Sequence, residues 1–140
     1  MADPLRPTDA AMAVAASALR AQQQRMRVIA ENIANADSTA TTANGAPYRR
    51  QVPVFEPERM TAGATGVRMT GVKPDRTPFH TEYNPGHPAA DAKGYVRLPN
   101  VDPLIEALDM KSAQRAYEAN LSVIETARAM QSRTLDLIKK

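Results

Sequence analysis

The sequence contains no cysteine and no tryptophan, and only 4% of its 140 residues are aromatic. The absence of cysteine excludes disulfides, thiolate nucleophiles and cysteine-based metal sites. Since aromatic side chains dominate most protein cores, a chain with so few of them is expected to build a thin core. Much of its 43% apolar content is alanine. We therefore expect neighbouring molecules to complete the burial of its apolar surface.

Glycine and proline are absent from two long stretches, residues 8–44 and 104–140. All six glycines and eight of the eleven prolines lie between residues 45 and 99. Because these residues interrupt regular structure most strongly, the pattern predicts a mainly α fold. Two long terminal helices in coiled-coil-like packing flank a small β-rich or irregular middle segment. The expected segments are 1–44, 45–102 and 103–140.

The first helix is predicted to begin near Thr8, which can cap it after Pro7. It should end after about 29 residues, where the turn-rich sequence DSTATTANG begins. The residues on one face of this helix recur with a seven-residue period, as in helices that pack against each other in coiled coils. One set of heptad positions holds Met12, Leu19, Met26 and Ile33, and the set three residues later holds Ala15, Gln22, Ile29 and Ala36.

The second helix has clear start signals. Asp102 can cap it, Pro103 suits its first position and Glu106 lies in its first turn. It is predicted to run to Ile138 and to be apolar on two sides, so we expect it to contact something on two sides. The main face gathers Met110, Ala113, Tyr117, Leu121, Ile124, Leu135 and Ile138. A second strip, about 100° around the helix, holds Val123, Met130 and Leu137.

Short alternating apolar patterns in the middle segment predict strands at Gln51–Phe55 and Val67–Val72. Pro53 restricts the first strand to an edge position, because proline cannot donate a hydrogen bond to a sheet. The turn-rich sequence that follows has few apolar anchors, among them Tyr95. We expect a small sheet or a set of hairpins there, rather than a second full domain.

Candidate catalytic groups are few. His80, Glu82 and His87, with Asp91 just beyond, are the best candidates for a zinc or acid–base site, because such sites use histidine and carboxylate ligands. Their convergence would depend entirely on a loop, so locally bonded or solvent-facing side chains are the favoured interpretation. No Gly-x-Ser-x-Gly turn and no phosphate-binding glycine loop occur. The sequence therefore predicts no enzyme, no cofactor, no metal and no small-molecule substrate.

The net charge of +3 raises nucleic acid as a partner. Each third of the chain carries only one excess positive charge, whereas a nucleic-acid surface concentrates basic residues on one element. The only adjacent arginine pair is Arg49–Arg50, so a small basic nucleic-acid-binding protein stays as the alternative function. The alanine-rich run Ala10–Leu19 has the length of a signal-peptide core, but Asp3 and Asp9 beside it favour a mature helix. No apolar run approaches the ~20 residues of a membrane span.

Four separated motifs carry a family resemblance. ENIANADS, PYRRQVPVFEP, YNPGHPAADAKGYVRLPNVD and RAYEANL resemble, in order and spacing, the proximal rod protein C family of the bacterial flagellar basal body, among the flagellar rod and hook axial proteins. The resemblance covers about Ala18 to Leu137. It implies a structural subunit without catalysis that assembles with other rod proteins and copies of itself. It also implies passage through the flagellar export apparatus without a cleaved signal, and a place in the rod that crosses the periplasm, where the rod transmits torque.

In that family the terminal helices form the wall of a helical tube and the middle segment lies outside. We expect Asn32 and Asn35 to bond to neighbouring subunits and so to fix the register, as a lone asparagine does in coiled coils. Unpartnered helices are expected to be frayed before assembly. The sequence departs from the family pattern at Asp37 and at Ala92–Lys93. The residues expected at subunit contacts are Leu19, Met26, Ile29, Asn32, Ile33, Asn35, Tyr48, Arg49, Pro85, Gly86, His87, Pro88, Tyr95, Pro99, Asn100, Arg115, Tyr117, Asn120, Leu121 and Ile124.

Overall fold

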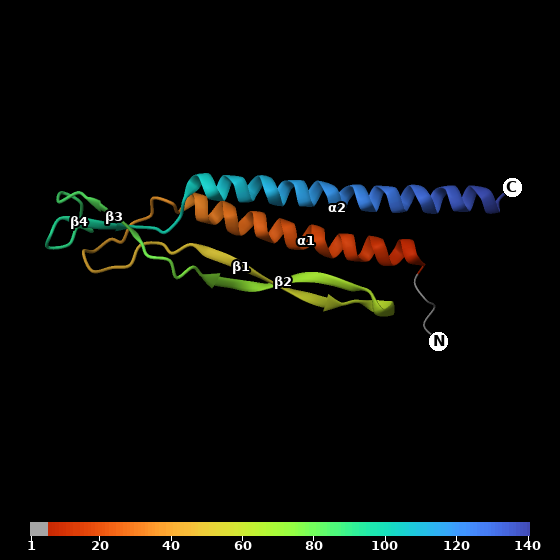
Figure 1. Cartoon of the computed structure of the whole chain (residues 1–140), viewed down its shortest axis with the longest axis horizontal. Helices are drawn as coiled ribbons and strands as arrows, with labels where there is room; N and C mark the ends of the chain where they lie inside the picture. The colour runs from red at the N-terminus through yellow and green to blue at the C-terminus, as the bar shows by residue number, and fades with distance from the viewer. Residues whose placement is uncertain (1–5) are drawn as a thin grey trace. The chain divides into compact units, whose positions relative to one another are not determined.

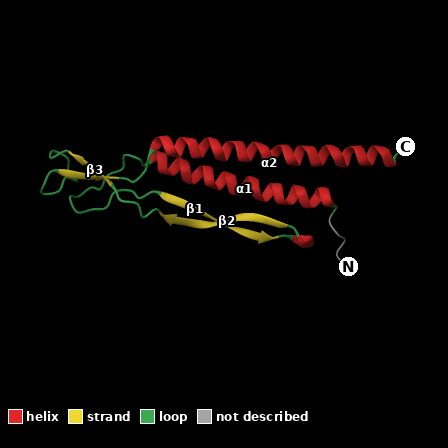
Figure 2. Cartoon of the chain, in the orientation of Figure 1, coloured by secondary structure: helices red, strands yellow, loops and turns green. Residues whose placement is uncertain are grey.

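The computed structural model describes residues 6–140, apart from the side chain of Ala62. In sequence order, a long helix comes first, four strands follow and a second long helix comes last (Figures 1 and 2). The fold is therefore mainly α with a small strand-containing middle, as predicted, while coiled-coil packing of the helices stays a prediction. The elements are α1 (Pro7–Ala34), β1 (Gln51–Arg59), the short 3₁₀ helix η1 (Thr61–Gly63), β2 (Thr65–Pro74), β3 (His80–Tyr83), β4 (Tyr95–Leu98) and α2 (Pro103–Ile138).

The described chain divides into two compact units. Unit 1 holds the described residues up to Met26, together with Val54–Gly71 and Lys111–Lys140. Unit 2 holds Arg27–Pro53 and Val72–Met110. The predicted division into three segments stays a prediction.

Helix α2 starts and ends as predicted, because its local signals are strong. The Asp102 carboxylate accepts a hydrogen bond from the backbone N–H of Leu104 at 2.9 Å, and proline occupies the first helical position. The predicted cap of α1 is wrong. Helix α1 already begins at Pro7, and Thr8 lies inside its first turn. The carbonyl of Arg6 accepts the first backbone hydrogen bonds, so proline at the first position marks this start too.

The strands are longer than predicted. β1 extends past Phe55 to Arg59, and β2 runs from Thr65 to Pro74. These two strands form one two-stranded sheet, and β3 and β4 form another. A two-stranded sheet consists only of edge strands, which explains why β1 tolerates its prolines. The predicted hairpin in the later middle segment is confirmed, since β3 and β4 pair antiparallel with His80 opposite Leu98 and Tyr83 opposite Tyr95.

The buried interior of unit 1 consists of small residues. Its described residues with the least exposure are four alanines, one serine and one glycine: Ala15, Ala21, Ala113, Ala127, Ser17 and Gly66. The interior of unit 2 includes larger apolar residues, Val28, Ile29, Val96 and Val101, beside the polar Asn32, Asn100 and Glu106. The thin core that the composition predicts is thus found in unit 1. Among residues 6–140, neither helix combines the length and apolar character that crossing a membrane requires.

A close approach between α1 and β2 holds the hairpin of unit 1 in place. The Ser17 hydroxyl donates to the carbonyl of Val14 at 2.7 Å and accepts from the backbone N–H of Val67 at 3.1 Å. A Cβ atom on Gly66 would lie 2.5 Å from the Ser17 oxygen. Glycine is therefore required at position 66 so that the strand can reach the helix.

Candidate assembly surfaces and the polar cluster of unit 2

Asn32, on the last turn of α1, uses its whole hydrogen-bonding capacity inside the chain. Its Nδ2 donates to the carbonyl of Gln51 at 2.9 Å and to Oε2 of Glu106 at 3.3 Å. Its Oδ1 accepts from the Tyr48 hydroxyl at 2.8 Å and from the backbone N–H of Gln51 at 2.9 Å. An amide has two donors and two acceptor sites, and Asn32 is only 1% exposed. All of these partners lie within the subunit, and the expected contact of Asn32 with a neighbouring subunit stays a prediction.

Asn35 differs from Asn32 in both position and partners. It lies in the turn after α1, where its Nδ2 donates to the carbonyl of Glu31 at 2.9 Å and its Oδ1 accepts from the Ser38 hydroxyl at 3.1 Å. Both contacts are local in sequence and accessible to solvent. Asn35 therefore helps to end the helix, and its expected contact with a neighbour stays a prediction.

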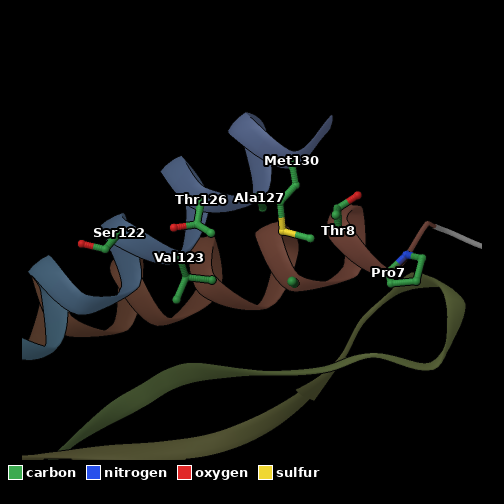
Figure 3. A pocket seen from close by; sticks show the side chains of 8 residues that line it. Pro7, Thr8, Ser122, Val123, Thr126, Ala127 and Met130 are labelled. Carbon is green, nitrogen blue, oxygen red and sulfur yellow. The ribbon is translucent and has the colours of Figure 1, made fainter. Parts of the chain in front are cut away.

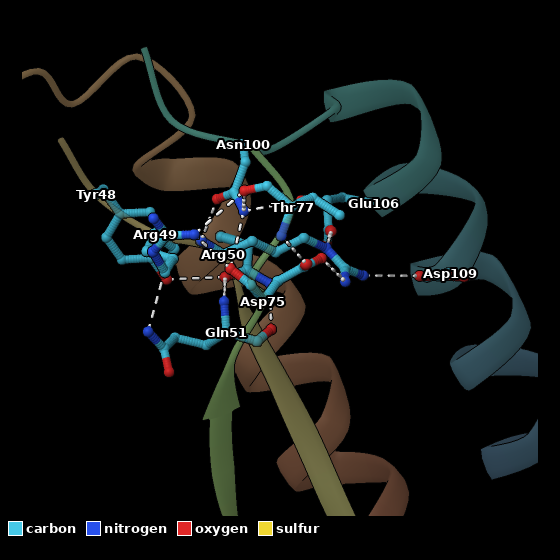
Figure 4. Close-up of polar contacts among 10 residues, drawn as sticks. Tyr48, Arg49, Arg50, Gln51, Asp75, Thr77, Asn100, Glu106 and Asp109 are labelled. Atoms are coloured by element: carbon cyan, nitrogen blue, oxygen red, sulfur yellow. Dashed lines mark hydrogen bonds and ion pairs between the residues drawn. The ribbon is translucent and has the colours of Figure 1, made fainter. Parts of the chain in front are cut away.

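Arg50 lies at the centre of a cluster of three carboxylates, which we call the Arg50 cluster: Arg50, Asp75, Glu106 and Asp109. Figure 4 shows the guanidinium reaching all three. Nε bonds to Glu106, Nη1 to Asp75 at 3.2 Å and Nη2 to Asp109 at 3.5 Å. Glu106 is fully buried, so its charge depends on these partners. One cation thus joins the loop after β2 to the first two turns of α2.

The segment around Asn100 closes the cluster from another side. The Asn100 Oδ1 accepts from the backbone N–H of Arg50 at 2.8 Å, and the Asn100 Nδ2 donates to the carbonyls of Asp75 and Thr77, each at 3.1 Å. Arg49 donates to the same two carbonyls, at 2.8 and 3.2 Å. Its guanidinium also lies 4.1 Å from the centre of the Phe79 ring. The loop after β2 is therefore held by two arginines and one amide (Figure 4).

These contacts shift three pKa values. Hydrogen bonding to the backbone N–H of Thr77, and then the contact with Arg50, lowers the pKa of Asp75. Burial acts to lower the pKa of Arg50, but its contacts with Glu106 and Asp75 outweigh burial and raise it. Burial raises the pKa of Tyr48, and the negative charges of Glu31 and Glu106 add to the effect. Near neutral pH the arginine and Asp75 are thus charged and the tyrosine hydroxyl remains a donor.

The β3–β4 turn holds four expected contact residues, Pro85, Gly86, His87 and Pro88, three of them exposed. His87 Nδ1 accepts from the backbone N–H of Ala89 at 3.0 Å, and Asp91 accepts from those of Lys93 and Tyr95. These groups therefore have local partners, as the favoured interpretation expects. Within the described part of the chain, no group of three or more potential metal ligands converges.

Gly94 has a structural reason to be glycine. Its φ of +84° lies in the left-handed region, and a Cβ atom would come within 2.8 Å of the Tyr83 ring. That ring packs edge-on against Tyr95, with 5.3 Å between the centroids. Gly94 thus allows the two tyrosines to meet at the end of the hairpin.

An open apolar groove of about 430 Å³ lies in unit 1. It runs between the start of α1 and the later part of α2, as Figure 3 shows. Two of the residues that line it are exposed, Val123 to 44% and Met130 to 55%, and Leu137 further along α2 is 76% exposed. The second apolar strip predicted on α2 is therefore confirmed as an exposed surface. The groove is lined by Pro7, Thr8, Ala11, Ser122, Val123, Thr126, Ala127 and Met130.

One polar contact joins the two helices beside this groove. Nε2 of Gln131, on α2, donates to the hydroxyl of Thr8 at 3.1 Å and to the carboxylate of Asp9. Gln131 thus has partners within the subunit. The Thr8 hydroxyl therefore accepts a hydrogen bond from α2 instead of capping α1.

The remaining expected contact residues lie at several depths. Ile29, Pro99 and Asn100 are buried, and Leu19, Met26, Tyr48, Arg49, Tyr117, Asn120 and Ile124 are half-buried. Ile33, Tyr95, Arg115 and Leu121 are exposed. The Asn120 side chain donates to the carbonyl of Ala116, one turn earlier, at 2.7 Å. Exposed and half-buried members are available to neighbours, but their contacts stay predictions.

The role of Glu106 was not predicted. This glutamate was placed in the first helical turn, but it also shares the inner face of α2 with Ala113, seven residues on, which is fully buried. A buried carboxylate requires a cation as its partner. The position of Glu106 on the buried face of the helix was therefore the signal from which an ion pair could have been predicted. Arg50 was matched to a motif but left out of the expected contacts, although it bonds to Glu106.

Comparisons with known proteins define the class. Residues 12–40 match the family model "Flagella basal body rod protein", and residues 92–137 match "Flagellar basal body rod FlgEFG protein C-terminal". The two matched ends cover most of both helices. This chain is thus a rod-type protein of the flagellar basal body.

Relatives identify the family more closely. The flagellar basal-body rod protein FlgC of Agrobacterium fabrum is 45% identical over 134 residues, which cover 95% of this chain and 96% of that protein. FlgC of Escherichia coli O157:H7 is 46% identical, covering 89% of this chain and 92% of that protein. FlgC of Bacillus subtilis is 37% identical, covering 90% and 95%. The chain therefore belongs to the FlgC family of structural basal-body rod subunits, and these matches lend no support to the nucleic-acid alternative.

Proposed function

We propose that this chain is an axial subunit of the rod, assembling with other rod proteins and with copies of itself into the helical drive shaft that transmits torque across the periplasm. Membership of the FlgC family supports a place in the basal body. The family is one of structural proteins, so the chain is proposed to carry no enzymatic activity. The terminal segments 1–44 and 103–140 are proposed to form the tube wall, with 45–102 outside it.

The exposed strip of α2 carries this proposal. Val123, Met130 and Leu137 lie on one side of the helix, and the groove in Figure 3 runs beside the first two. Each such side chain contributes roughly 1.5–3 kcal/mol when it is fully buried. Large apolar groups in a row favour a surface that a neighbour covers. A contact between two different surfaces of identical subunits does not close on itself and so gives open helical growth.

The same features fit export through the flagellar apparatus without a cleaved signal. The interior of unit 1 is built from alanine, serine and glycine, so it gains little from apolar burial and should unfold at low cost. We expect the terminal helices of the free subunit to fray, because long helices in water depend on tertiary packing. Circular dichroism of the purified chain should then show less than the ~65 helical residues of the fully formed helices. A fully helical, sharply melting monomer would contradict this expectation.

Complementation of a deletion strain tests the proposed assembly. Met130→Asp places a charge in the strip, while Ser132→Asp places the same charge about 200° around α2, at another exposed position. We expect the deletion strain to lack rods and motility, Met130→Asp to leave both absent at normal protein levels, and Ser132→Asp to restore them. Rods in the deletion strain would refute the function, and full motility with Met130→Asp would refute the role of the strip.

A further inference from the structure

We propose that Arg50 is a positioning residue of the subunit, which holds the first two turns of α2 in place before any neighbour is present. The inference concerns the free chain and depends on the proposed assembly only in its last test. Arg50 lies in the segment between α1 and β1, far in sequence from the helix that it holds. Its bond to Glu106 spans 56 residues and its bond to Asp75 spans 25.

The geometry requires a guanidinium. Nε, Nη1 and Nη2 each contact a different carboxylate, and the three carboxylates come from two separate segments. A planar fork with several fixed donors can serve them at once, whereas the single ammonium of lysine cannot. Without the fork, three negative charges would face one another around the fully buried Glu106. The first turns of α2 would then move so that water could reach that carboxylate.

Glu106 also links this arrangement to the other helix within unit 2. Its second oxygen accepts from Asn32 at 3.3 Å, and the Asn32 amide is itself held by Gln51, the residue next to Arg50. Asn32 gives a single neutral donor to Glu106, whereas Arg50 gives a charged one. The position of Glu106 relative to the last turn of α1 therefore depends chiefly on Arg50.

Arg49 provides a matched control in the adjacent position. Both arginines are half-buried, but Arg49 contacts two carbonyls and the Phe79 ring, and within the described residues its guanidinium bonds to no carboxylate. A lysine ammonium can donate to both carbonyls and lie over the ring. Arg49→Lys should therefore be tolerated where Arg50→Lys is not.

Hydrogen exchange of the purified full chain, read by mass spectrometry, tests the inference. In Arg50→Lys, amides of residues 103–110 should exchange at least about tenfold faster than in the wild type, while those of β3 and β4 change less than about twofold. Arg49→Lys should match the wild type in both segments. Unchanged exchange at 103–110, equal acceleration throughout unit 2, or an unprotected 103–110 in the wild type would each overturn the inference.

A milder variant covers the case in which Arg50→Lys does not fold. Asp109→Asn removes the charge of the most exposed of the three carboxylates and leaves the contacts with Glu106 and Asp75. It should accelerate exchange at residues 103–110 by a smaller factor, again without change in β3 and β4. The inference is wrong if Asp109→Asn has no effect there, or if its effect spreads evenly over the unit.

Rod assembly separates this inference from the proposed function. In the deletion strain, Arg50→Lys should not restore motility when its protein level equals that of the wild type. If Arg50→Lys swims normally while the deletion strain does not, Arg50 has no positioning role and the proposed function stands. If the deletion strain itself builds rods, the proposed function fails, and the exchange result still decides the role of Arg50.

Discussion

Replacing Asn32 with leucine tests whether the amide at the end of α1 acts within the subunit. The change removes four hydrogen bonds that join the amide to Gln51, Tyr48 and Glu106. At roughly 1 kcal/mol each, their loss costs about 4 kcal/mol. A leucine at this buried site recovers roughly 1.5 kcal/mol through apolar burial. We therefore expect the free energy of unfolding to fall by about 2–3 kcal/mol.

Asn35→Leu is the matched control, three residues away on the same chain segment. Its two side-chain contacts are local and exposed, so the free energy of unfolding should change by less than about 0.5 kcal/mol. Urea denaturation of both variants and the wild type, followed by circular dichroism, measures the difference. If Asn32→Leu unfolds at the wild-type urea concentration while rods are lost, the amide acts between subunits and the reasoning from its contacts is refuted.

Two further changes follow from the described contacts. Gly66→Ala should lower the free energy of unfolding by about 1–3 kcal/mol, because its Cβ would meet Ser17; thermal unfolding measures the loss, and an unchanged midpoint would contradict the close approach of the strand to the helix. Asp75 has a pKa lowered below 3.8 by its bonds to Thr77 and then by Arg50, so its stabilising effect is present above pH 3.8 and is lost as the pH falls through the lowered pKa. The urea midpoint of the wild type should therefore fall more steeply below pH 3.8 than that of Asp75→Asn. Parallel curves for these two proteins would show that the carboxylate does not stabilise the fold.

Local signals predicted the helices well and the strand ends poorly. Asp102, Pro103 and Glu106 act within one turn of one another, so the start of α2 could be located from sequence. The strand lengths were underestimated because prolines were taken as breaks. In a two-stranded sheet, a proline whose nitrogen faces away from the partner strand costs no pairing, and β1 therefore continues beyond Pro57 to Arg59.

The Arg50 cluster could not be predicted because its members are far apart in sequence. Arg50 meets Asp75 and Glu106 only after the middle segment has folded back, and no periodic pattern encodes such a contact. The motif containing Asn32 could be recognised, but its partners could not. A polar residue beside an apolar stripe indicates that partners exist, without indicating whether they lie in the same chain.

The pairing of Asn32 with Gln51 also bears on solubility. The amide occupies both backbone groups that Gln51 turns away from β2, in the way that another strand would. Two residues on, on the same side of the strand, Pro53 offers no N–H. At this end of the β1 edge, the backbone groups of Gln51 are already hydrogen-bonded and Pro53 has no N–H to donate, so another strand cannot pair there. Edges of this kind resist the strand-to-strand aggregation that open sheet edges promote. A subunit that we propose to assemble through its helices is thus protected, at this edge, from assembling as an amyloid-like sheet.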